Sequence, residues 1–240
     1  MRIFFLVLLL ASFAIAPSTL GQDQASRNSN EVKIAFENDQ IRVLHARYGP
    51  HQRIAMHSHP ARVVVCVTAM HVLTTLSDGQ TQELRCRPGD SRWSEPVTHS
   101  VENLEDAPFE VVEIEMEKAT VAAIAVPPPA PSDRPLTEPV PVEREPHHHF
   151  VFQNQYVRVL NVLFPVGETS LFHTHSNDNV SVSIRGDKTQ SQPFGGEWTE
   201  AQDVKPGIVG FHKARGQAYT HRVRSAGELP FNVIDIEIFP

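Results

Sequence analysis

Two segments of the chain alternate strictly between apolar and acidic residues. Residues 112–117 read Val-Glu-Ile-Glu-Met-Glu, and residues 234–238 read Ile-Asp-Ile-Glu-Ile. Because successive side chains of a β-strand point to opposite faces, this period of two predicts strands with apolar side chains on one face and carboxylates on the other. The β-branched run at 63–67 suits a buried strand, and Asp78-Gly79 between two further runs predicts a hairpin turn.

No helical stripe of useful length follows the first residues of the chain. Short β-prone runs recur at regular spacing instead, and glycine and proline separate them. This organisation predicts an all-β fold, with a sandwich or barrel in each half of the chain.

The strand pattern occurs twice because the chain contains a long internal repeat. Residues 36–44 read Phe-Glu-Asn-Asp-Gln-Ile-Arg-Val-Leu, and residues 152–160 read Phe-Gln-Asn-Gln-Tyr-Val-Arg-Val-Leu, an offset of 116 (152 − 36). A second matching pair, 108–115 and 230–237, has an offset of 122 (230 − 108). Solenoid repeats are only about 20–50 residues long, so this repeat indicates a duplicated domain. Residues that both copies retain are therefore the first candidates for function.

Three histidines are retained in both copies. Each copy has a His-x-His pair at the first offset (173 − 57 = 116) and one later histidine at the second (221 − 99 = 122). The members of a pair point to the same face of a strand, so both imidazoles can bind one metal ion, with a third supplied by another strand. Neutral imidazole binds Fe, Zn, Ni, Cu and Mn, and a three-histidine set leaves positions open for water or substrate. The predicted ligands are His57, His59 and His99 in the first copy, and His173, His175 and His221 in the second.

Other side chains near these histidines give weaker signals. His147, His148 and His149 form a tract after a proline-rich segment. Short exposed histidine runs bind Ni²⁺ or Zn²⁺ adventitiously, and we interpret this tract in that way. No duplicated acidic residue is recognised beside the predicted ligands, so no general acid or base is assigned.

The N-terminal residues have the character of a targeting signal. Arg2 precedes an almost unbroken apolar run at 3–16, which is shorter than the roughly 20 residues that span a bilayer. We predict a signal peptide at 1–21, and the alternative is an uncleaved anchor. The mature protein is then secreted or periplasmic, without a stable membrane span.

Composition divides the rest of the chain. Residues 22–30 form a flexible polar segment, residues 31–118 the first domain, and residues 147–240 the second. Between the domains, residues 119–146 are rich in proline, which stiffens a chain into a semi-rigid linker. The formal net charge is −7 and no basic cluster occurs, which argues against nucleic acid as a partner.

The two cysteines of the chain, Cys66 and Cys86, both lie in the first copy. Export makes a disulfide chemically feasible. The sequence does not decide between two core residues and one structural bridge. Since the second copy has no cysteine, neither cysteine belongs to the set of candidate functional residues that both copies retain.

With these residues in place, the chain resembles the cupin superfamily. Residues 167–175, with Gly186 closing the motif, resemble the first cupin motif, and residues 88–103 resemble the second. Two copies look like a bicupin, similar to germin-type proteins, and imply two jelly-roll barrels that each hold a metal. The glutamate of the family motif should fall near Val64 and Val180, where both copies have valine. The resemblance then implies three-histidine sites like those of some Fe(II) cupin dioxygenases.

The sequence predicts a general class of function and no particular substrate. The preferred hypothesis is a metal-dependent, dioxygenase-like oxidoreductase for a small organic substrate, with Fe(II) favoured over Zn, Mn, Ni or Cu. One alternative is a non-redox cupin isomerase or lyase acting on a sugar or organic acid, and another is a non-catalytic metal-binding or ligand-binding cupin. The resemblance also implies a homodimer.

Overall fold

The computed structural model describes residues 32–130 and 136–240. The predicted signal peptide and the polar segment after it therefore lie outside the described residues. Within these two ranges the protein is built of β-strands with one short 3₁₀ turn, η1 (Val142–Arg144), so the all-β prediction is confirmed. In the same ranges, no helix has the length and apolar character to cross a membrane.

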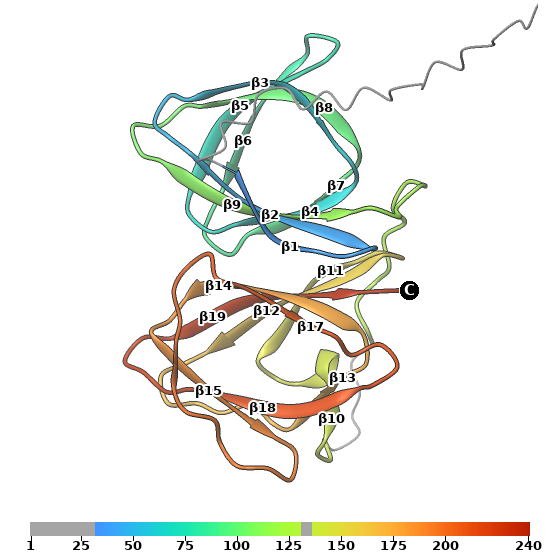
Figure 1. Ribbon diagram of the computed structural model, residues 1–240, viewed down its shortest axis with the longest axis vertical. Coiled ribbons are helices and arrows are strands. Elements are labelled where there is room, and N and C mark those ends of the chain that lie inside the picture. The colour runs from blue at the N-terminus through green and yellow to red at the C-terminus, as the bar shows by residue number, and fades with distance from the viewer. Residues whose placement is uncertain (1–31, 131–135) are drawn as a thin grey trace, which may run out of the picture.

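The N-terminal half of the molecule consists of two antiparallel sheets (Figure 1). In spatial order, sheet A contains β1 (Val32–Glu37), β2 (Ile41–Tyr48), β9 (Phe109–Met116), β4 (Arg62–Cys66) and β7 (Ser91–Ser94). Sheet B contains β3 (Arg53–His59), β8 (Val97–Asn103), β5 (Met70–Leu76) and β6 (Thr81–Cys86).

The C-terminal half repeats this arrangement with one addition. Sheet C contains β11 (His148–Gln153), β12 (Val157–Phe164), β19 (Phe231–Ile238), β14 (Asp178–Arg185) and β17 (Val209–His212). Sheet D contains β10 (Val140–Pro141), β13 (His173–His175), β18 (Tyr219–Ser225), β15 (Lys188–Pro193) and β16 (Gln202–Asp203). The added strand, β10, comes from the proline-rich segment and pairs in parallel with β13.

The two alternating segments form β9 and β19, each of which pairs with two strands of its sheet. The apolar side chains of these segments pack in the core between the two halves, and Glu113, Glu115 and Asp235 point toward the interior of their own half. Both faces are buried, because Ile236 is 0% exposed and Glu237 is 1% exposed. The predicted alternation is therefore present, and it separates an apolar interface from a polar interior.

The largest apolar core lies between the two halves, where sheet A packs on sheet C (Figure 1). Both sheets contribute branched apolar side chains to it; the buried members are Ile41, Val43, Val63, Val65, Val67, Val112, Ile114, Met116, Val157, Val159, Val180, Val182, Ile184, Ile234, Ile236 and Ile238. At its edges Phe36 stacks on Phe211 at 4.1 Å, and Trp93 stacks on Tyr156 at 5.6 Å, between ring centroids. Each half also has a smaller core of its own between its two sheets.

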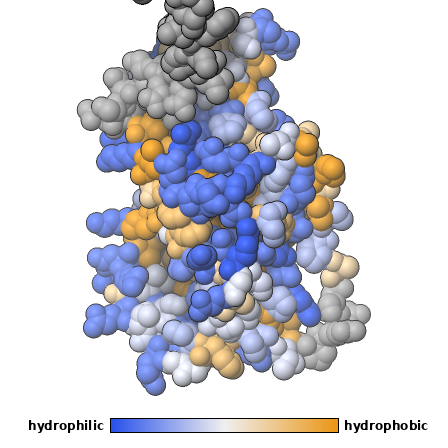
Figure 2. Space-filling model, turned by 45° about the vertical axis from the view of Figure 1, so that its right-hand side comes forward, coloured by the Kyte–Doolittle hydropathy of each residue, from blue (hydrophilic) through white to orange (hydrophobic). Residues whose placement is uncertain are grey.

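The outer surface is mixed in character. On the face shown in Figure 2, hydrophilic residues predominate and apolar residues form smaller groups among them. Individual exposed apolar side chains, such as Ile124 and Phe194, are ordinary for a folded protein.

The hairpin predicted at Asp78-Gly79 joins β5 and β6. Gly79 has φ +85°, whereas Asp78 is not among the described residues with positive φ. The loop is closed by the amide of Leu76, which donates to the carbonyl of Gln80. The hairpin prediction is thus confirmed, with a longer loop than a two-residue turn.

Cys66 and Cys86 form a disulfide that joins β4 of sheet A to β6 of sheet B, with 6.5 Å between the Cα atoms. The bridge closes a loop with a sequence separation of 20 residues. Loop-closure entropy for such a loop corresponds to about 3 kcal/mol. We expect the paired replacement Cys66→Ala and Cys86→Ala to lower the free energy of unfolding by about this amount in urea denaturation. A loss below about 1 kcal/mol would contradict this account, and the variant should be insensitive to reductant.

Candidate metal centres

The N-terminal half brings His57, His59 and His99 together. His57 and His59 lie on β3, and His99 lies on the neighbouring β8 directly opposite His57. The ring centroids are 4.8 Å apart for His57 and His59, 4.9 Å for His57 and His99, and 5.4 Å for His59 and His99. One ring nitrogen from each lies within 4.8 Å of the others, an arrangement that could hold a metal ion.

Two carboxylates of β9 flank this trio from sheet A. Glu115 lies 2.8 Å from Nδ1 of His59, and Glu113 lies 3.6 Å from the same atom. Arg42 donates two hydrogen bonds to Glu115, and Arg62 donates one to Glu113. A carboxylate bound to Nδ1 fixes the ring and leaves Nε2 available as the ligand atom.

Burial keeps the imidazole of His99 neutral. For His99, burial is the main cause that lowers the pKa to about 3, and the neighbouring His57 and Arg62 lower it further. Burial alone would raise the pKa of Glu115, but hydrogen bonds from His59 and Arg42 hold it below its usual value. Neutral imidazole beside an ionised carboxylate is the state that binds a metal cation.

The C-terminal half repeats the geometry on β13 and β18. His173 lies directly opposite His221, as His57 lies opposite His99, and His175 lies opposite Tyr219. The centroid of His173 is 5.1 Å from that of His175 and 4.6 Å from that of His221. His173 and His175 are 1% and 3% exposed, so this centre is more deeply buried than its counterpart.

Hydrogen bonds orient the rings of this centre. Nδ1 of His173 donates to the carbonyl of Leu171, and Nδ1 of His221 bonds the hydroxyl of Ser191. Nε2 of His221 is buried without a hydrogen-bond partner among the described residues. Burial is the main cause that lowers the pKa of His173 to about 4 and that of His221 to about 3. These rings therefore stay neutral and retain nitrogen lone pairs that no described protein donor uses.

A fourth histidine, His148, joins this cluster from β11. Its ring centroid is 4.6 Å from that of His173 and 6.4 Å from that of His175. The three-residue group whose ligand atoms lie within 4.8 Å of one another is His148, His173 and His175, with His221 beside it. The interpretation of His147–His149 as an exposed tract is therefore wrong for His148, which is 9% exposed.

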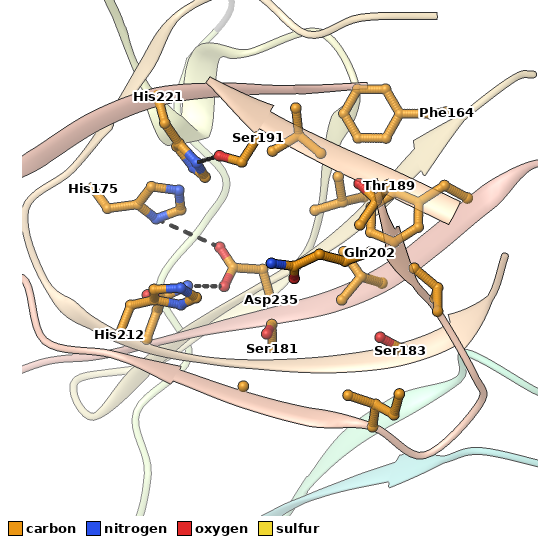
Figure 3. Close-up of a pocket in the computed structure, with 18 of the residues that line it drawn as sticks. Phe164, His175, Ser181, Ser183, Thr189, Ser191, Gln202, His212, His221 and Asp235 are labelled. Carbon is orange, nitrogen blue, oxygen red and sulfur yellow. Dashed lines mark hydrogen bonds and ion pairs between the residues drawn. The ribbon is translucent and has the colours of Figure 1, made fainter. Parts of the chain in front are cut away.

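The cluster opens into a cavity of about 320 Å³ inside the C-terminal half. Figure 3 shows His175, His221 and His212 toward one end of this cavity and Phe164 toward the other. Hydroxyl and amide groups line the space between these ends; they belong to Ser181, Ser183, Thr189, Ser191 and Gln202. Among the described residues that line the cavity, none is lysine or arginine.

Asp235 places a carboxylate beside the C-terminal histidines. It lines the cavity, accepts a hydrogen bond from Asn179, and lies 3.8 Å from Nδ1 of His175 (Figure 3). Burial is the main cause that raises its pKa to about 6. Tyr219 stacks on His175 at 4.8 Å and donates its hydroxyl to Asn179.

The sequence reading missed these carboxylates. Glu113 and Asp235 correspond at the second offset (235 − 113 = 122), as do Glu115 and Glu237. The retained arginines of the repeat bind the latter pair, Arg42 to Glu115 and Arg158 to Glu237, each at 2.6 Å. The statement that no duplicated acid accompanies the ligands is therefore wrong. The alternating pattern and its duplication together would have identified these carboxylates.

The alignment of the valines at the motif-glutamate position also needs correction. Val64 lies opposite Glu113, whereas Asp235 lies opposite Ser181, one residue beyond Val180. Val180 packs in the core between the halves, and Ser181 lines the cavity. Arg62 lies opposite Glu115 and Asn179 lies opposite Glu237, so at this point the offset between the copies is 117 (179 − 62), one more than at the His-x-His pair. No carboxylate from this strand faces either described centre.

Comparisons with known proteins bear on the fold. No protein-family model matches the sequence, and no curated protein matches it. The solved structures that resemble it include AerE from Microcystis aeruginosa, with 12% identity over 90% of this chain and 96% of that one and a TM-score of 0.63. A variant of oxalate decarboxylase from Bacillus subtilis has 14% identity over 83% and 69%, with a TM-score of 0.54.

Salicylate 1,2-dioxygenase from Pseudoaminobacter salicylatoxidans, as an adduct with gentisate, has 12% identity over 83% of this chain and 68% of that one, with a TM-score of 0.53. At sequence identities this low, the structural similarity is evidence for the fold alone. The all-β architecture described above is the part of the structure to which this likeness applies. The chain shares its overall fold with these three solved structures.

Proposed function

We propose that this protein is an exported bicupin, with a signal peptide and two cupin barrels joined by the proline-rich segment. In this proposal it is a non-haem, Fe(II)-dependent, dioxygenase-like enzyme for a small organic substrate. The observation that carries the proposal is the buried histidine cluster at one end of a cavity of about 320 Å³ in the C-terminal half. A cavity of this size suits a small ligand.

The donor set fits a divalent transition metal. His173, His175 and His221 would hold it in the C-terminal half, and His57, His59 and His99 in the N-terminal half. Three imidazole ligands leave coordination positions open on the cation, and oxygen atoms of a substrate could occupy them. A bound metal would polarise such oxygens as a Lewis acid, and iron would add the redox chemistry that O₂ requires.

The protein's own residues position the substrate. Hydroxyl groups of Ser181, Ser183 and Thr189 offer hydrogen bonds along the cavity, and Phe164 closes its apolar end. The proposed substrate therefore has oxygen donors at one end and a hydrocarbon portion at the other. His173 and His175 are nearly fully buried at the histidine end, whereas His212 is exposed there.

A second candidate is metal-dependent proton transfer, as in an isomerase or lyase. Asp235 favours it, because this buried carboxylate lines the cavity within 3.8 Å of a histidine ring. A general base must stand within reach of the proton that it abstracts, and a carboxylate at this place meets that requirement.

Oxygen uptake separates the two candidates. Untagged protein is analysed for bound metal, loaded with Fe(II) without air, and assayed with small diketones, phenols and thiols in an oxygen electrode. We expect substrate-dependent O₂ consumption in the native protein and in the exposed-site control His149→Ala, and none in His173→Ala. Turnover without O₂ that is lost in Asp235→Asn would favour proton transfer. Failure to bind any transition metal would contradict both candidates.

A further inference from the structure

We propose that His148 is a fourth metal ligand, so that the C-terminal half contains a four-histidine centre of His148, His173, His175 and His221. The inference rests on metal binding in that half. It makes the two halves chemically different, because three histidines gather in the first and four in the second.

The distances suit a shared ion. The ligand atoms of His148, His173 and His175 lie within 4.8 Å of one another, and the ring of His221 is 4.6 Å from that of His173 and 5.2 Å from that of His175. Metal–nitrogen bonds of about 2.0–2.1 Å separate tetrahedral ligands by about 3.4 Å. Small side-chain rotations therefore bring the rings to bonding distance.

Glu145 holds His148 in the orientation that a ligand needs. Its side chain is 0% exposed, and one of its oxygens lies 2.6 Å from Nδ1 of His148. It also accepts hydrogen bonds from the backbone amides of His147 and Leu171 and from the ring of His147. Because Nδ1 of His148 is bound in this way, Nε2 is the atom that faces the cluster. Carboxylate–histidine pairs of this kind orient metal ligands in proteins.

The neighbours of His148 do not share its position. His149 is exposed, and His147 lies against Phe164 with 4.5 Å between ring centroids and binds Glu168 through Nε2. Only His148 lines the cavity among these three residues. The alternation along β11 thus selects one ring of the tract for the centre.

The N-terminal half lacks this ligand. Val32 corresponds to His148 (148 − 32 = 116), since Val32 lies opposite Ala46 and His148 lies opposite Val162 at the same offset. Val32 packs on the apolar core of its half. An additional neutral nitrogen ligand and deeper burial both favour tighter metal retention in the C-terminal half.

The test compares His148→Ala with the matched variant His149→Ala in the full-length protein. Each is stripped of metal and titrated with Co²⁺ alone, with a competing chelator to measure affinity and with visible absorption to report the coordination. We expect His149→Ala to match the native protein. We expect His148→Ala to bind Co²⁺ in the C-terminal half at least about 10-fold more weakly, with a changed absorption spectrum.

The outcomes distinguish this inference from the proposed function. If His148→Ala binds Co²⁺ with native affinity and spectrum, His148 is not a ligand, and the proposed function is untouched. If the native protein binds no Co²⁺ in this half, both fail. Unfolding temperatures of the metal-free proteins identify a folding defect. Should His148→Ala have one, Glu145→Gln provides the second test. This substitution removes the charge and one of the two oxygens that accept from Nδ1 of His148 and from the backbone amides of His147 and Leu171. An unchanged Co²⁺ spectrum in Glu145→Gln would overturn the proposal.

Discussion

Replacing His173 and His175 together by alanine is expected to remove one metal ion per chain. Both rings are almost fully buried and belong to the group whose ligand atoms lie within 4.8 Å of one another. Loss of residues that merely orient ligands weakens metal binding by about 10–100-fold, so losing two direct ligands should exceed that range. Metal content measured after gel filtration reports the result.

The matched variant removes His57 and His59 from the N-terminal half. It should lose the other ion and leave the C-terminal one in place, because the two centres lie in separate halves. Metal that binds only the folded state stabilises it by about 4 kcal/mol at a thousandfold excess over its dissociation constant. Added metal should therefore raise the unfolding temperature less in either variant than in the native protein. Unchanged metal content in both variants would contradict the assignment of these histidines.

The convergence of these side chains could be predicted because the chain repeats itself. Strand periodicity puts the two rings of each His-x-His pair on one face, and duplication marks the third histidine. The structure brings these side chains together, with His57 opposite His99 and His173 opposite His221. Metal binding by them stays a prediction that the experiments above test.

His148 could not be found in this way. It has no counterpart in the first copy, where Val32 occupies its place. Its orientation depends on Glu145, which follows the η1 turn in a segment that the repeat does not include. Three consecutive histidines show no periodic pattern. Only tertiary contacts therefore distinguish His148 from His149.

The carboxylates illustrate a different limit. The alternation of β9 and β19 identified two faces and left open which face each half encloses. An isolated domain with an apolar interior would turn Glu115 outward, but here the other half of the molecule covers the apolar face. Glu115 consequently points inward to His59 and Arg42. Packing against the sheet of the other half thus determines which face of the strand points inward. The local sequence of β9 or β19 does not specify that packing.

Ile236 lies in the core that the two halves share. This side chain is 0% exposed, and on its sheet it lies between Val159 and Val180. Ile236→Ala should lower the free energy of unfolding by about 2–5 kcal/mol through lost burial and the remaining cavity. Ile236→Asp would bury an unpaired carboxylate, which costs several kcal/mol more. Since whole proteins are stable by only about 5–15 kcal/mol, Ile236→Asp should not fold stably.

Because sheets A and C share this core, Ile236→Ala should destabilise both halves although the substitution lies in one of them. Trp93 belongs to the first half and stacks on Tyr156 at the interface, and Trp198 belongs to the second half. Single-tryptophan versions made with Trp198→Phe or Trp93→Phe therefore report, in urea, the interface side of the first half and the second half, respectively. We expect both reporters to shift to the same lower midpoint. Leu163→Asp is the matched control on the same sheet, because Leu163 is 43% exposed and should tolerate the charge. A shift seen by Trp198 alone would mean that the halves unfold independently and that the interface contributes little to the N-terminal half.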